Sequence, residues 1–178
     1  MNRLYSHLLL ALVALAFAAA PDTARAQTPE NPPTVEDSPS RAARFSAGLQ
    51  SSWPTYGLSL QYHLNEKLTA EGVADFMGNL TNVGGRVLYR YRRDGDYDLY
   101  AYGGGGVWHY SFLGVGESVP GASVGVGAEA FLEQLLGAPG EPFLPITLSA
   151  EVGLAFVGFE TYGGFSALSY GGGIHYRF

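Results

Sequence analysis

His109 and Ser111 lie two residues apart, and side chains of these types could together catalyse a nucleophilic reaction. Residues two apart on a strand share one face, so the histidine could act as general base beside a serine nucleophile. Glu117 or Glu129 would then be the acid that orients the base. From the alternation of the surrounding strand, we expect the His109 side chain to point into the barrel. We therefore favour the simpler interpretation, polar residues near a strand end, with catalysis by His109, Ser111 and Glu129 as the alternative.

Other reactive side chains give no further site. His63 and His175 are isolated and lack metal-ligand spacing, and the chain has no cysteine, so we predict neither a metal site nor a cofactor. The net charge of −6, without a basic cluster, argues against nucleic-acid binding.

Charged side chains fall on one face of the strands that we expect. They are Glu71, Asp75, Arg86, Arg90, Arg92, Glu129, Glu151 and Arg177. The numbers of acids and arginines are equal, and an unpaired buried charge costs several kcal/mol, so we expect an interior network of salt bridges. A narrow channel for ions or small solutes is the alternative, but rings of one sign would favour it and this balance does not.

About eight strands must position these side chains. The alternation places them at 44–51, 55–64, 67–77, 83–92, 98–110, 122–131, 146–157 and 168–178. We expect no Asp, Glu, Lys or Arg on the apolar face of the second to eighth strands. The opposite face has few large hydrophobic residues and would make a weak soluble core.

Aromatic residues decide which face is outside. Tyr56 and Tyr62 bracket the second strand, and Tyr102 and Trp108 bracket the fifth. Aromatic girdles flanking an apolar band are typical of a transmembrane β-barrel. The fold class that we predict is therefore all-β, an antiparallel up-and-down membrane barrel, with a soluble lipocalin-like domain as the alternative.

The N-terminal region carries an export signal. A basic start and the uncharged apolar run Leu8–Ala20 precede Ala24-Arg25-Ala26, which predicts a signal peptide at 1–26, cleaved after Ala26. Residues 27–42 are rich in proline, and we expect a disordered periplasmic leader there. The barrel domain then spans 43–178.

The C-terminal strand, Leu168–Phe178, ends on aromatic residues, Tyr176 and Phe178. It resembles the C-terminal signature of bacterial outer-membrane β-barrels. The resemblance implies that Tyr176 and Phe178 form an insertion signal for the barrel-assembly machinery. Together with Tyr-Gly-Gly-Gly-Gly-Val at 102–107 and Gly-Val-Gly-Ala-Glu at 125–129, the span 44–178 resembles the superfamily of small outer-membrane β-barrels that includes the OmpX-like and OmpA-like eight-stranded domains.

That superfamily includes structural, adhesive, resistance and enzymatic members, so the fold alone selects no activity. His109-Tyr110-Ser111 resembles the His-x-Ser arrangement of outer-membrane lipid A deacylases, but Phe112 stands where that pattern has Asn. We predict a non-enzymatic monomer among outer-membrane lipids, with a structural or surface-interaction role. A lipid A-modifying enzyme is the alternative.

An even number of strands puts both barrel termini on one side, which we take to be the periplasm. The segments 52–54, 78–82, 111–121 and 158–165 are then outer loops. The connection 132–145 is long for a periplasmic turn, and 132–136 could form a helical turn within it.

Overall fold

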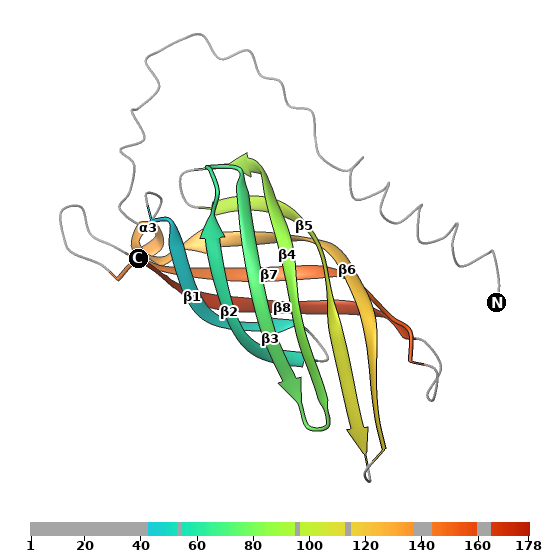
Figure 1. Ribbon diagram of the computed structural model, residues 1–178. Helices are drawn as coiled ribbons and strands as arrows, with labels where there is room; N and C mark the ends of the chain where they lie inside the picture. Colours follow the sequence, from blue (N-terminus) through green and yellow to red (C-terminus); the bar gives the residue numbers. More distant parts are fainter. Residues whose placement is uncertain (1–42, 53–54, 95–96, 113–114, 137–143, 160–164) are drawn as a thin grey trace, which may run out of the picture. The chain divides into compact units, whose positions relative to one another are not determined.

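The computed structural model describes residues 43–52, 55–94, 97–112, 115–136, 144–159 and 165–178 (Figure 1). Eight antiparallel strands form one closed barrel in sequence order. The elements are β1 (Phe45–Ser52), β2 (Thr55–His63), β3 (Leu68–Met77), β4 (Leu80–Arg93), β5 (Tyr97–Phe112), β6 (Val115–Phe131), α3 (Leu132–Leu136), β7 (Ile146–Val157) and β8 (Phe165–Arg177). The predicted all-β, antiparallel up-and-down barrel of eight strands is confirmed. The predicted signal peptide and leader, 1–26 and 27–42, lie outside the described residues.

Pairing of the first and last strands closes the barrel. Ser46 is opposite Arg177, and the backbone nitrogens of Phe45 and Phe178 donate to each other's carbonyl oxygens at 3.3 and 2.9 Å. We call this end of the barrel, with Phe45 and Phe178, the terminal end. The opposite end, where β3 meets β4 at Met77 and β5 ends at Phe112, is the distal end.

Turn chemistry explains two of the connections. Gly78 has a φ of 58°, a conformation that glycine adopts without strain, and it allows the two-residue turn that pairs Met77 with Leu80. The side-chain oxygen of Asn65 accepts hydrogen bonds from the backbone nitrogens of Lys67 and Leu68, both at 2.9 Å, and so fixes the turn between β2 and β3.

The predicted boundaries hold best where alternation is clean. β7 covers the predicted 146–157, and α3 forms at the predicted 132–136. The predicted loop 111–121 is wrong, because β6 already begins at Val115 and pairs with β5 up to Phe112. No helix in the described part of the chain is long and apolar enough to cross a membrane.

The faces of β5 are reversed relative to the prediction. Tyr100, Tyr102 and Trp108 point into the barrel and are only 1%, 4% and 8% exposed, so Tyr102 and Trp108 are not girdle residues. The reason is steric: the Tyr102 ring lies where side chains of Gly125 and Gly153 would be. The glycines on β6 and β7 make room inside the barrel for the rings of β5.

A β-bulge explains a second misplaced residue. On β4, Arg90 is opposite Tyr100 but Arg92 is opposite Leu99, so Tyr91 is an extra residue. One inserted residue reverses the alternation of side chains beyond it. The Arg92 side chain is 56% exposed and pairs with Asp94 at 2.9 Å, so its predicted interior position is wrong.

The packing of β5 against β6 and β7 predicts a steric effect at Gly153. Gly153→Val places methyl groups where the Tyr102 hydroxyl lies, and we expect it to destabilise the refolded barrel by about 1–3 kcal/mol in urea unfolding. Gly103→Val is the matched control, because a Cβ at Gly103 meets nothing within 4 Å. Equal stability of both variants would contradict the inward packing of Tyr102.

Candidate functional site

Arg86 occupies the middle of the barrel interior and joins two walls. Its Nε donates to Glu71 on the neighbouring strand β3, while Nη1 and Nη2 donate to the Glu151 carboxylate on β7 at 2.8 and 2.9 Å. The Tyr100 hydroxyl and the Gln50 amide also donate to Glu151, at 2.7 and 3.1 Å. A guanidinium held by two carboxylates in this way is a buried, hydrogen-bonded ion-pair network.

Glu71 has polar partners on three other strands, β2, β4 and β8. Ser59 and Gln61 on β2 donate to its Oε1, with a distance of 3.2 Å for Gln61. His175 on β8 lies 3.7 Å from the same oxygen and 3.0 Å from the Ser59 hydroxyl. Together with Arg86 on β4, these contacts connect the closing strand to the first half of the barrel.

A second network fills the terminal end. Glu129 on β6 pairs with Arg90 on β4 at 2.8 Å and with Arg177 on β8 at 2.9 Å. Arg90 also donates to the Thr69 hydroxyl, and the Arg177 guanidinium lies 4.8 Å from the centre of the Phe131 ring. The two arginines reach Glu129 from different walls, so the network crosses the lumen.

Sequence reasoning missed Asp98 as a member of this second network. Asp98 is 2% exposed and lies 3.5 Å from Arg90 and 3.8 Å from Arg93. The signal was present in the sequence, because Asp98 shares its parity with Tyr100 and Tyr102. An acid on that face contradicts the expectation of a charge-free apolar face and identifies the face as inward.

At the distal end, a hydrophobic cluster lies inside the barrel. Trp108, Val119, Val157 and Phe159 pack together, with Leu80 and Tyr110 against them. Asp75 is opposite Asn82, which is itself opposite Trp108 of the cluster, and it accepts hydrogen bonds from Asn82 and Thr55 at 3.1 and 3.4 Å. Side chains therefore occupy the lumen in three groups, which are the Arg86 network, the Glu129 network and the hydrophobic cluster at the distal end.

The residues of the possible hydrolytic triad are not brought together. His109 is exposed on the outside of β5, and its Nδ1 lies 2.8 Å from the Ser118 hydroxyl rather than bonding to Ser111. Glu129 pairs with Arg90 and Arg177 at the other end of the barrel, so it cannot orient His109. The inward orientation predicted for His109 is wrong for the same reason that the aromatic face of β5 was misassigned.

Within the described ranges, no three His, Cys, Asp or Glu side chains come close enough together to hold a metal ion.

Comparisons with known proteins show a similar fold in a solved structure. No protein-family profile matches the sequence, and no curated protein matches it. Among solved structures, the N-terminal β-barrel domain of Pseudomonas aeruginosa OprF is similar, with a TM-score of 0.53 and 14% sequence identity. The similarity covers 75% of this chain and 96% of that domain, and it shows the same eight-stranded antiparallel barrel architecture.

The two environments of arginine on β4 predict unequal effects of the same substitution. Arg86→Met leaves Glu71 and Glu151 without their guanidinium, and we expect a loss of about 3–5 kcal/mol in urea unfolding of the refolded barrel. Arg92→Met removes an exposed pair and should cost about 1 kcal/mol or less. Similar losses for both variants would refute the central role of Arg86.

Proposed function

We propose that this chain is an integral outer-membrane protein whose barrel is closed by a polar plug, with a structural or surface-interaction role and no enzymatic activity. The observation that carries the proposal is the inverted polarity of the barrel. Large hydrophobic side chains are exposed on the outside, among them Leu49, Leu58, Leu60, Val83, Val87, Val107, Val152 and Ile174. A soluble barrel would direct such residues inward and its charges to water.

Aromatic belts support the membrane placement. At the terminal end, the Phe45 ring is tilted against Tyr62 and stacks with Phe178, at ring-centre distances of 4.9 and 6.2 Å, and at the distal end Tyr56 contacts Phe76 edge-on at 5.0 Å. None of the described outward-facing side chains between these belts is Asp, Glu, Lys or Arg. This pattern suits a lipid-facing band between two interfaces.

Surface presentation is supported by the hairpin of β5 and β6. β7 pairs with β6 only as far as Gly121, whereas β6 continues to Val115 beside β5. The hairpin therefore extends past its neighbour β7 at the distal end (Figure 1). It exposes His109, Ser111 and Phe112, a mixed polar and aromatic surface suited to contact with lipid headgroups or another molecule.

Insertion would use the other end of the barrel. Tyr176 and Phe178 are exposed at the outside of the terminal end, which leaves them accessible to the barrel-assembly machinery. We propose that the terminal end faces the periplasm, together with the N-terminal leader, and that the distal end faces outward.

Because side chains occupy the interior, we predict that the barrel does not conduct ions. Two ion-pair networks and the distal hydrophobic cluster occupy the lumen, so the refolded protein should give no steady conductance steps in planar bilayers. The same sample should shift in mobility on boiling in SDS gels, which shows that the barrel was folded. Reproducible conductance steps from such a sample would support the alternative function, a narrow channel.

The proposed orientation can be tested by labelling, because the natural chain has no cysteine. Asn79→Cys lies in the turn between β3 and β4 at the distal end, and Lys67→Cys lies in the turn between β2 and β3 at the terminal end. On intact cells, a membrane-impermeant maleimide should label the cysteine at 79 and should label that at 67 only after lysis. The reverse pattern would mean that the barrel is inserted the other way.

A further inference from the structure

The distal half of the barrel interior holds more negative than positive charge. At the terminal end, Arg90 and Arg177 balance Asp98 and Glu129. Towards the distal end, Arg86 already serves both Glu71 and Glu151, and among the described residues Asp75 has no Lys, Arg or His partner within 4 Å. His175 beside Glu71 can carry at most one further positive charge.

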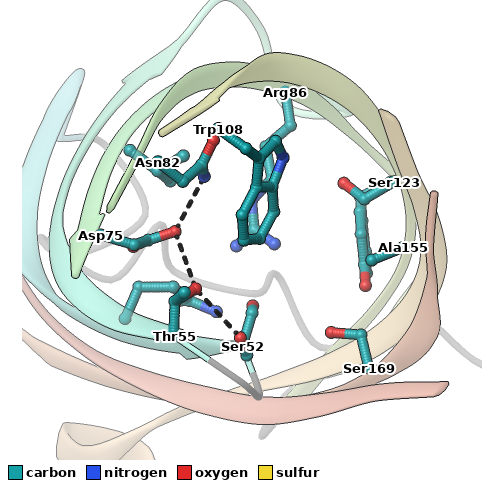
Figure 2. Close-up of a pocket in the computed structure, with 12 residues that line it drawn as sticks. Ser52, Thr55, Asp75, Asn82, Arg86, Trp108, Ser123, Ala155 and Ser169 are labelled. Carbon is teal, nitrogen blue, oxygen red and sulfur yellow. Dashed lines mark hydrogen bonds between the residues drawn. The ribbon is translucent and has the colours of Figure 1, made fainter. Parts of the chain in front are cut away.

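Asp75 is buried where this excess occurs. Its side chain is 7% exposed and borders a cavity of about 50 Å³ (Figure 2). Gln50, Thr55, Asn82, Arg86, Trp108 and Ser123 also line the cavity. One water molecule needs about 10–15 Å³ of such space, so the cavity has room for a small ion together with a few water molecules.

Some buried oxygen atoms near the cavity have no hydrogen-bond partner in the described structure. Asp75 Oδ2 accepts from Asn82 and Thr55, but within the described structure Oδ1 has no hydrogen bond. The side-chain carbonyl oxygens of Gln50 and Asn82 likewise have none, but they lie beside Gly173 on β8 and Gly106 on β5. A buried carboxylate without a counter-charge is strongly destabilising, so some positive charge must offset it.

We propose that the Asp75 cavity binds one hard cation. The Asp75 carboxylate is the charged ligand, the Thr55 hydroxyl oxygen beside it is a neutral ligand, and water in the cavity completes a set of oxygen donors that hard cations prefer. These two side chains come from β3 and β2, so the ion joins neighbouring strands inside the lumen. The ion pairs of Arg86 with Glu71 and Glu151 offset the positive charge of this guanidinium beside the site.

The test is the thermal unfolding midpoint of the refolded full chain in zwitterionic detergent. At constant ionic strength and pH, replacing choline chloride with sodium, magnesium or calcium chloride should raise the midpoint by about 3 °C or more with at least one of these ions. The rise should saturate as expected for a single site. An identical midpoint in all four salts would overturn the proposal, as would a midpoint that responds to pH alone, because a proton would then neutralise Asp75.

Variants assign the effect to the cavity. Asp75→Asn should abolish the dependence on the cation and be at least as stable as the wild type in choline chloride, because it removes the uncompensated charge. The matched control, Asp94→Asn, alters an exposed carboxylate and should keep the full shift. Thr55→Val removes one neutral ligand with little change in shape, so it should raise the cation concentration at half-maximal shift several-fold. A shift that persists unchanged in Asp75→Asn and Thr55→Val would place the ion elsewhere.

Discussion

The closure of eight strands into one barrel is the constraint on which the rest of the structure depends. A barrel of this size has an interior that side chains fill, so each inward polar group must find its partner among the other walls. Arg86 and Glu129 are the centres of this arrangement, because each binds partners on two other strands. The ion pairs that connect distant strands thereby also close the lumen.

The same narrow interior explains the glycine and aromatic content of the chain. Rings on β5 lie against glycines on β6 and β7, where Cβ atoms would collide with them. The outside follows a different rule, because leucine, valine and tyrosine side chains of the described strands are exposed there. Inverted polarity and tight internal packing are thus two results of one closed sheet.

Alternation of side chains predicted the strands and their antiparallel order. Of the eight charged residues that it placed in the interior, seven lie there and Arg92 does not. It failed where a local feature breaks the period. At Tyr91 the bulge reverses the faces and turns Arg92 outward, and single-residue insertions leave no clear mark in the pattern. In β5 the run Gly103–Gly106 has no side chains to mark a face, so the aromatic residues were assigned to the lipid although they fill the interior. The cavity at Asp75 depends on how side chains from all eight strands meet, which periodicity does not describe.

The most direct test of a closed barrel with a lipid-facing exterior is an SDS gel of isolated outer membranes, run with and without boiling. We predict that the protein is found in that fraction and migrates at a different apparent mass until it is boiled, because the closed sheet resists SDS. Recovery as a soluble protein with one mobility under both conditions would contradict the account, since the exposed apolar face would then have to be covered in water.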